Sequence, residues 1–244
     1  KMIYDTIQAV KPWIKMGMGP GGIWSTSKAV HTAYGLPYPD NLSGGESQTY
    51  ANLYCNTVAW IRDGYVEYVA PQIYWASTSA HHDFTNLCKW WANVVKHYSD
   101  LLPDGKKCFS WPSAAPYRDE YNPAEIETEI DNTRKFDQIG ESGMVYYNTK
   151  SYLNKMVSQV QKDRYQYKSL LPAFSWKKHE NLGAPQNVKL EGSILKWDKI
   201  NEQTRYTVYA YPKGMNKQLY EQIFTEKDDD RYIKETEKVI RSKF

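Results

Sequence analysis

Aromatic and amide side chains are the residues of this sequence whose types and positions could do chemistry. Tyr, Trp and Phe make up 15% of the 244 residues. Their flat faces can stack on the C–H surface of a sugar ring, while amide and guanidinium groups hydrogen-bond its hydroxyls. The same aromatic residues also fill ordinary cores, and composition alone favours that role. The candidate substrate-binding residues, which follow four short apolar segments, are Trp24, Gln72, Tyr74, Trp75, Trp111, Tyr117, Arg118 and Asn148.

Carboxylates would be needed for hydrolysis of a sugar chain, because one carboxyl group usually acts as acid and a second as nucleophile or base. Asp83, Asp119 and Glu120 lie in loops that follow expected strands, so they could reach a site there. Glu67 comes early in its segment, and we expect it to be buried or at the opposite end of its strand. No expected strand carries a carboxylate directly at its carboxyl end. The sequence therefore leaves the catalytic residues unassigned.

The sequence shows no metal-binding or cofactor-binding motif. Residues 81–83 (His-His-Asp) are adjacent, and neighbouring side chains rarely chelate one metal well, so a solvated loop is favoured. The acidic run 228–230 lacks the spacing of a calcium loop. Cys55 and Cys88 lie among apolar residues, which is typical of buried thiols. We expect no metal, no cofactor and no disulfide framework.

Charge and hydropathy exclude two further classes. The net charge is only +3, which does not indicate a dedicated nucleic-acid-binding protein. No apolar run approaches the roughly 18 residues that a membrane-spanning helix needs. We therefore expect neither a nucleic-acid partner nor a membrane-spanning segment, and no signal peptide is visible at the start of the sequence.

Helix-like and strand-like segments alternate over the first 165 or so residues. Apolar residues at helical spacing alternate with short β-branched and aromatic runs, which is typical of parallel βα units. No glycine-rich phosphate-binding motif is present, which disfavours a nucleotide-binding fold. The expected helices are 2–10, 46–62, 85–98, 122–139 and 151–161, and the expected strands are 14–18, 65–75, 106–110 and 143–147.

The last part of the chain has a different pattern. From about residue 185, apolar and polar residues alternate between turn signals, which predicts antiparallel strands. The order of Pro, Val, Trp and Tyr in this part resembles the first strands of a fibronectin type III module. Only about 60 residues remain, whereas such sandwiches have about 100. We expect one domain over 1–180 and a short β-sandwich-like module over 185–244.

Several motifs resemble those of a bacterial family, glycoside-hydrolase-like family 10. The most specific is WIRDGYVEYVAPQIYW at 60–75, and KPWI at 11–14 leading into GPGGIW at 19–24 also fits. Trp90-Trp91 and the segment 171–176 agree as well. The resemblance covers roughly residues 1–180. Gly19 and Gly21 depart from the family pattern, so the loop that contains them is expected to differ in shape.

This resemblance implies an α/β fold of the (β/α)8-barrel type, of which the chain would supply only the second half, about four βα units. It also implies hydrolysis of a bacterial cell-wall glycan such as peptidoglycan, or of another polysaccharide, by carboxylate general acid/base chemistry. The catalytic carboxylates would lie in an absent N-terminal half. The alternatives are a non-catalytic carbohydrate-binding protein that uses aromatic platforms, and a purely structural or interaction module.

The resemblance further implies a location outside the cytoplasm. A cell-wall substrate requires a periplasmic, outer-membrane-associated (lipoprotein) or secreted enzyme. Half a barrel would leave open sheet edges and an exposed apolar interior. We therefore expect the chain to pair with a second copy or with a retained N-terminal fragment.

Overall fold

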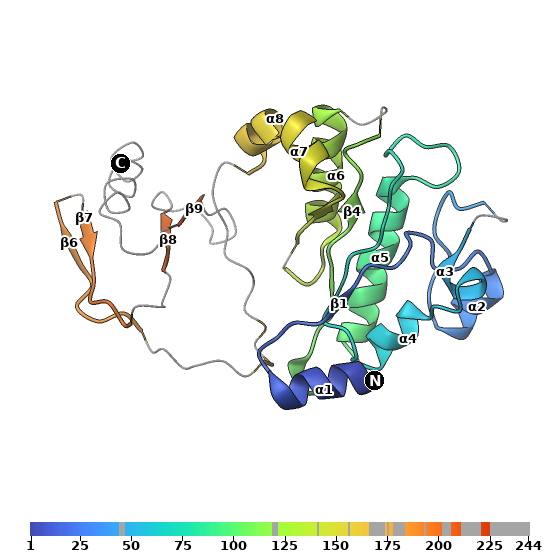
Figure 1. Cartoon of the computed structure of the whole chain (residues 1–244), viewed down its shortest axis with the longest axis horizontal. Helices are drawn as coiled ribbons and strands as arrows, with labels where there is room; N and C mark the ends of the chain where they lie inside the picture. Colours follow the sequence, from blue (N-terminus) through green and yellow to red (C-terminus); the bar gives the residue numbers. More distant parts are fainter. Residues whose placement is uncertain are drawn as a thin grey trace. The chain divides into compact units, whose positions relative to one another are not determined.

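The computed structural model forms two compact units, and each is described by itself (Figure 1). The first unit consists of Lys1–Arg164 and Phe174–Lys178, and the second contains the remaining residues. The structure describes residues 1–43, 47–118, 122–140, 142–155, 157–165, 174, 176–177, 184–192, 194–201, 206–210 and 221–224.

The strands of the first unit are short and parallel. β1 (Gly17–Met18) pairs with β2 (Tyr68–Val69), which pairs with β3 (Phe109–Ser110), so the spatial order follows the chain order. β4 (Ser113–Ala114) pairs with β5 (Val145–Tyr146) in the same parallel sense. Single bridges from Gln72 to Gly21 and to Ser113 extend the ladder. The mixed α/β class is thus confirmed, while the assignment to half of a barrel stays a prediction.

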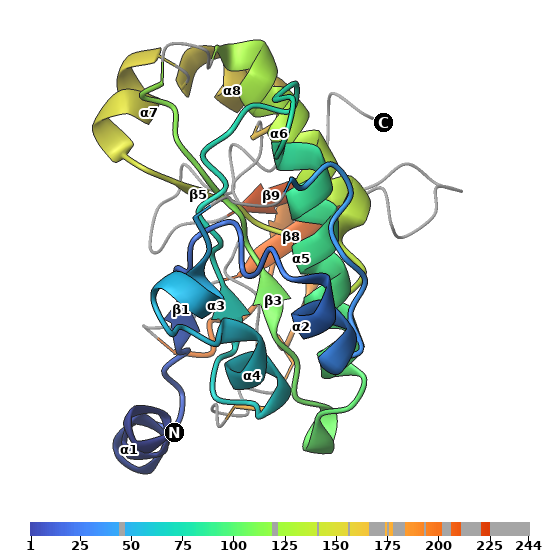
Figure 2. The same cartoon turned by 90° about the vertical axis from the view of Figure 1, so that its right-hand side faces the viewer.

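Helices connect these strands. Figure 2 shows the two longest, α5 and α6, running side by side. Asp83 caps the first of them by accepting the N–H of Asn86 at 2.8 Å, and Asn122 caps the second by accepting that of Glu125 at 3.0 Å. The helices are α1 (Met2–Val10), α2 (Lys28–Ala33), α3 (Thr49–Asn52), α4 (Thr57–Arg62), α5 (Phe84–Ser99), η1 (Pro103–Gly105, a 3-10 turn), α6 (Pro123–Phe136), α7 (Thr149–Lys155) and α8 (Val157–Asp163). None of those described has the length and apolar character needed to cross a membrane.

The prediction of one continuous helix over 46–62 is wrong. The chain forms α3 and α4 instead, and Tyr54 between them has a φ of 51° and is 92% exposed. Leu53, the residue before it, is also 69% exposed, so this stretch does not form the buried face that a continuous amphipathic helix would need. Asn56 starts α4 by accepting the N–H of Ala59 at 3.1 Å, which a continuous helix would not allow.

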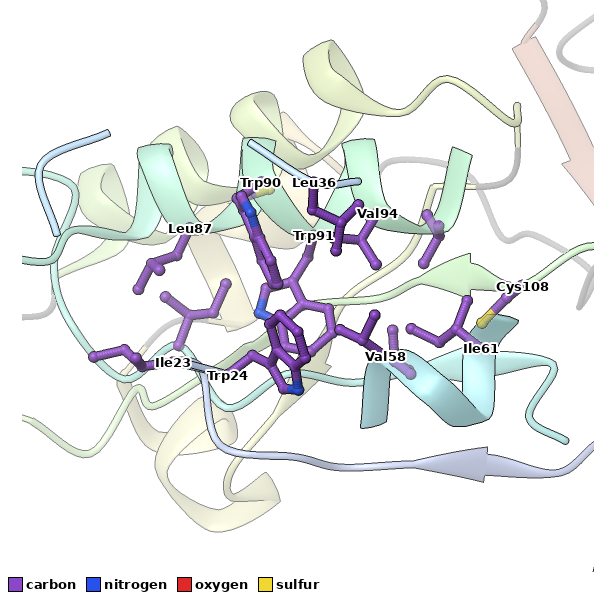
Figure 3. Close-up of a cluster of buried hydrophobic side chains, with 14 of the residues drawn as sticks. Ile23, Trp24, Leu36, Val58, Ile61, Leu87, Trp90, Trp91, Val94 and Cys108 are labelled. Carbon is purple, nitrogen blue, oxygen red and sulfur yellow. The ribbon is translucent and has the colours of Figure 1, made fainter. Parts of the chain in front are cut away.

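The core of the first unit lies between α5 and the parallel strands. Figure 3 shows Trp91 and Val94 of α5 close to Val58 and Ile61 of α4. Val69, on β2, is fully buried in the same cluster. Trp91 has no exposed surface, and its neighbour Trp90 is only 3% exposed, so both are core residues.

The second unit contains antiparallel strand pairs among its described residues. β6 (Lys189–Glu191) pairs with β7 (Ile194–Lys196), and β8 (Thr207–Ala210) pairs with β9 (Glu221–Phe224). The antiparallel character agrees with the alternating sequence pattern. The likeness to a fibronectin type III module stays a prediction, and the acidic run 228–230 lies outside the described residues.

A buried ion pair lies before the amino end of β2. Lys177 forms a salt bridge with Glu67, and the two side chains are 6% and 3% exposed. The Lys177 ammonium also donates to Gln8 Oε1 and to the Ile14 carbonyl, both at 2.8 Å. Glu67 Oε2 accepts the N–H of Met16 at 2.7 Å. This network joins the end of the first unit to α1 and to the segment before β1.

Lys177→Met should lower the free energy of unfolding by about 3 kcal/mol, because it leaves the Glu67 carboxylate buried without its cation. Lys89→Met is the matched control, since Lys89 and its partner Asp40 are exposed. Its effect should stay below about 1 kcal/mol. Urea unfolding followed by tryptophan fluorescence measures both. Similar small effects of the two substitutions would contradict this role of the ion pair.

The buried side chain of His31 should make the free energy of unfolding depend on pH. Its ring is 1% exposed, with its two nitrogens 3.1 and 2.9 Å from the carbonyls of Pro37 and Ser25. Burial lowers the pKa of His31 below its ordinary 6.5 more than the two carbonyls raise it. Below about pH 6.5 the unfolded chain therefore binds a proton that the folded protein does not.

The free energy of unfolding should consequently fall as the pH drops from about 6.5 toward the folded pKa of His31, by up to about 1.4 kcal/mol per pH unit. His31→Gln should flatten this part of the profile, and His97→Gln, at an exposed position of α5, should leave it unchanged. Urea titrations at a series of pH values measure the profile. An unchanged slope in His31→Gln would assign the pH dependence to other groups.

Candidate functional site

A cavity of about 520 Å³ opens at the carboxyl ends of β1 and β2. It joins the glycine-rich loop that follows β1 to the segment that follows β2 and to α3. Its lining residues are Met18, Gly19, Pro20, Gly21, Gly22, Ile23, Ser47, Gln48, Thr49, Leu53, Cys55, Gln72, Tyr74, Trp75 and Arg118. Four of the eight predicted substrate-binding residues are therefore together at one cavity.

Hydrogen bonds fix the glycine-rich loop against Gln72. The Gly22 N–H donates to the Gln72 carbonyl at 3.1 Å, and the Gln72 N–H donates to the Pro20 carbonyl at 2.8 Å. The Gln72 side-chain amide also donates to the Gly19 carbonyl at 3.1 Å. From the core, the Trp91 indole N–H donates to the Gly22 carbonyl at 2.8 Å. Gln72 is exposed and lines the cavity, beside a loop whose backbone these hydrogen bonds order.

The loop needs glycine because other segments approach it closely. A Cβ at Gly22 would lie 2.7 Å from the Gln72 carbonyl oxygen and 3.0 Å from the Trp75 ring. A Cβ at Gly21 would lie 2.8 Å from the Thr49 methyl group. Because Gly22 has no side chain, the Trp75 ring can pack directly against the loop at the wall of the cavity. The departure from the family pattern at Gly21 therefore has a steric reason in this chain.

Tyr74 and Trp75 provide the aromatic wall of the cavity. Trp75 is half-buried, packs on the core cluster and makes an edge contact with the His82 ring at 4.5 Å between centroids. Tyr74 stacks on Tyr147 at 6.0 Å and 21°. Burial raises the pKa of Tyr74, a shift that a hydrogen bond with Ser113 partly opposes, so its phenol stays protonated at neutral pH. Tyr74 can therefore donate a hydrogen bond beside an apolar ring face.

The prediction of Trp24 as a sugar-binding residue does not fit its position. Its side chain is 1% exposed and stacks on Trp90 at 6.0 Å, with Tyr50 and His31 making edge contacts at 5.3 and 5.2 Å. Figure 3 shows Trp24 inside the hydrophobic cluster. A ligand cannot stack on a face that core residues already cover. Trp24 supports the loop from within, and it does not line the cavity.

The other predicted residues lie around the cavity or apart from it. Trp111 is half-buried and stacks on Tyr68 at 4.7 Å and Phe109 at 6.0 Å, on the strands themselves. Tyr117 is 44% exposed, next to the cavity residue Arg118. Asn148 is exposed, and its side-chain oxygen accepts the N–H of Ser151 at 3.1 Å, in the first turn of α7.

The carboxylates that the sequence offers for catalysis are engaged elsewhere or lie outside the described residues. Asp83 is 3% exposed, caps α5 and accepts the Asn41 amide at 2.9 Å. Glu67 is buried in its ion pair, which confirms the expectation for it. Asp119 and Glu120 fall outside the described residues. Among the described residues that line the cavity, none is an aspartate or a glutamate.

Metal binding finds no support in the part of the chain that the structure describes, and two of the three thiols are buried. No group of three or more His, Cys, Asp or Glu side chains there could hold a metal ion. The three cysteines are free. Cys88 is buried as expected, but the expectation is wrong for Cys55, which is only partly buried and lines the cavity. Burial raises the pKa of Cys88 to about 12 and that of Cys108 higher still, so both thiols stay protonated.

Sequence reasoning missed Gln48, Thr49 and Tyr147. Gln48 and Thr49 line the cavity, but the single predicted helix over 46–62 assigned them no role at a site. Thr49 is pinned by its N–H, which donates to the Ile23 carbonyl at 3.1 Å. Tyr147 directly follows β5 and is 56% exposed. Its place at the end of a predicted strand was the signal that could have found it.

Comparison with known proteins adds independent information. A family model described as glycosyl hydrolase-like 10 matches residues 1–122. A Bacillus subtilis protein named glycosyl hydrolase YngK is 28% identical over 221 residues, which are 86% of this chain and 41% of that protein. An Escherichia coli K12 protein named glycosyl hydrolase DigH is 34% identical over 94 residues, which are 38% of this chain and 20% of that protein. The chain thus spans less than half the length of these relatives.

Gly22→Ala should lower the free energy of unfolding by about 1–3 kcal/mol, because its methyl group would overlap the Gln72 carbonyl, which is backbone and cannot move aside freely. Gly19→Ala is the matched control, since its Cβ would meet only ordinary contacts at 3.7 Å. Urea unfolding compares the two variants. Equal stability would mean that the loop does not depend on the close approach of Gly22 to Gln72.

Proposed function

Because the chain belongs to the glycosyl hydrolase-like 10 family, we propose that it is part of a glycoside hydrolase and that the cavity beside Gln72 binds a saccharide. The observation that carries the proposal is the combination, at one cavity, of an ordered amide (Gln72), a phenol (Tyr74) and an indole (Trp75). The two relatives compared above are both named glycosyl hydrolases, which supports the same class of activity.

The cavity has the size and chemistry that a sugar unit requires. Its volume of about 520 Å³ lies within the range of small-molecule sites. Trp75 lines the cavity, and an indole ring can offer an apolar surface to the C–H groups of a sugar. The Gln72 amide is held in place by the Gly19 carbonyl, so its free oxygen is pre-ordered to accept from a sugar hydroxyl.

The proposal places the catalytic carboxylates outside this chain. The described lining of the cavity contains no carboxylate, and the relatives are more than twice as long as the aligned part. A general acid and a nucleophile or base would come from the additional length, opposite the aromatic wall. The substrate would be a bacterial cell-wall glycan or another polysaccharide, and the protein would be periplasmic, outer-membrane-associated or secreted.

The proposal also covers the fold of the two parts of the chain. Residues 1–180 would form the second half of a (β/α)8 barrel, and 185–244 a fibronectin type III-like module. The parallel strands β1 to β3, paired in chain order, support the first part. The exposed apolar side chains of Ile3 and Val10 on α1, at 63% and 68% exposure, support pairing with the rest of a barrel or with a second copy.

A non-catalytic carbohydrate-binding protein is the second candidate. The absence of carboxylates from the described lining of the cavity favours it, because the aromatic and amide groups alone suffice to bind a sugar. The two candidates share the saccharide site and differ only in turnover. Binding and bond cleavage therefore need separate measurements.

Trp75→Ala should weaken binding of oligosaccharides by about tenfold or more, because it removes the stacking face of the cavity. Isothermal titration calorimetry with N-acetylglucosamine oligomers, cello-oligosaccharides and purified peptidoglycan strands measures this. Trp13→Ala is the control, since Trp13 is 59% exposed and is not part of the cavity. Trp75→Phe tests whether a smaller ring restores part of the affinity, and circular dichroism checks folding.

The absence of binding to all three kinds of glycan would overturn the saccharide site. Release of reducing ends by this chain alone would overturn the placement of the carboxylates outside it. A protein that joins this chain to the additional length found in its relatives should release reducing ends from peptidoglycan strands or another tested polysaccharide. If it binds these glycans without releasing them, the carbohydrate-binding alternative is correct.

A further inference from the structure

Three tyrosines from three different segments meet beside the cavity. Tyr74 follows β2, Tyr117 follows β4 and Tyr147 follows β5. Tyr74 and Tyr147 are stacked, with 6.0 Å between ring centroids and 21° between planes. Tyr117 meets Tyr147 edge to face, at 6.1 Å and 80°. The cluster thus forms an aromatic corner with one flat side and one perpendicular side.

The corner is open to solvent on its outer part. Tyr147 is 56% exposed and Tyr117 is 44% exposed, whereas Tyr74 is half-buried. Large aromatic side chains usually bury most of their surface, and exposed apolar surface that is gathered in one place often marks a binding site. Tyr117 and Tyr147 therefore offer exposed aromatic surface to a ligand that reaches the cavity.

The backbone holds these rings in position. The Tyr147 N–H donates to the Ala114 carbonyl at 2.9 Å, and the Val145 N–H donates to the Pro112 carbonyl at 3.0 Å. Tyr117 follows residues 112–116, all of them buried. A ring that is ordered before binding loses little conformational entropy when a ligand arrives. The corner is thus pre-organised, as a binding platform needs to be.

Tyr74 connects the corner to the cavity. It lines the cavity and stacks on Tyr147, so the two sites share one side chain. All three side chains combine an apolar face with a hydroxyl group, which matches the C–H faces and hydroxyls of a saccharide.

We propose that Tyr117 and Tyr147 form a second saccharide subsite next to the cavity, so that the chain binds an oligosaccharide across both. This inference rests on the proposed function, because it extends the same glycan beyond the unit beside Gln72. In this proposal Tyr147, which no sequence motif singled out, contacts only the longer oligosaccharides and so makes affinity depend on glycan length. A disaccharide occupies the cavity alone, and a longer oligomer also covers the tyrosine corner.

The test compares short and long oligomers of N-acetylglucosamine by isothermal titration calorimetry on the full chain. The unmodified protein should bind the hexasaccharide more tightly than the disaccharide. Tyr147→Ala should lower the hexasaccharide affinity about tenfold, and its disaccharide affinity should stay within about twofold of that of the unmodified protein. Tyr147→Phe, which keeps the ring, should behave like the unmodified protein, and Tyr117→Ala should lose part of the same length dependence.

Each other outcome has a definite meaning. An equal loss for both oligomers in Tyr147→Ala would show that Tyr147 only holds Tyr74 in place, and would overturn the second subsite. Full hexasaccharide affinity in Tyr147→Ala, or no length dependence in the unmodified protein, would overturn it as well. If peptidoglycan strands or cello-oligosaccharides bind and the N-acetylglucosamine oligomers do not, the same comparison uses short and long fragments of the glycan that binds. Equal affinity of Tyr147→Ala and the unmodified protein for its long fragment then overturns the second subsite. Failure of all three kinds of glycan overturns the proposed function itself.

Discussion

The hydrogen bonds at Gly22 connect the core of the first unit to its candidate site. Its N–H donates to the Gln72 carbonyl at 3.1 Å, and its carbonyl accepts the buried indole N–H of Trp91 at 2.8 Å. No side chain fits at this position, because a Cβ would lie 2.7 Å from the Gln72 carbonyl oxygen. The loop, the exposed Gln72 amide and the Trp75 wall therefore take their positions from one close approach of backbone to backbone. A helix that is packed in the core thereby orders a surface cavity.

Stability and recognition are separated along the parallel strands. Before β2 begins, Glu67 and Lys177 form a buried ion pair, which joins α1 and the end of the first unit. At the carboxyl ends, polar and aromatic groups remain open around the cavity. This division is general for parallel α/β structures, in which ligands bind outside the carboxyl ends of the strands. A buried charge at the amino end can thus be fully paired, while side chains at the other end stay free to meet a ligand.

The described lining of the cavity combines aromatic and amide side chains and contains no carboxylate. Gln72, Tyr74 and Trp75 supply hydrogen bonds and stacking, while the described carboxylates nearest in sequence have structural partners: Asp83 caps α5, and Glu67 holds Lys177. In the proposed function, recognition of the glycan and cleavage of its bond come from different parts of a longer protein. In the same proposal, the three tyrosines beside the cavity would extend the surface that binds the glycan toward β5.

The sequence by itself determined the parallel α/β class, the helices α1, α5 and α6 to within a few residues, the antiparallel pattern after residue 185 and the family. These features depend on periodicity, on caps such as Asn122 and on a specific motif at 60–75, all of which are local. It also brought Gln72, Tyr74, Trp75 and Arg118 forward as a group, since they follow neighbouring strands. Only the tertiary structure decided that Trp24 is buried, that the helix over 46–62 is broken at Tyr54 and that Tyr147 is exposed beside Tyr74. The reason is physical: whether an aromatic ring is covered depends on which distant segments pack against it, and the type of the residue is the same in both cases.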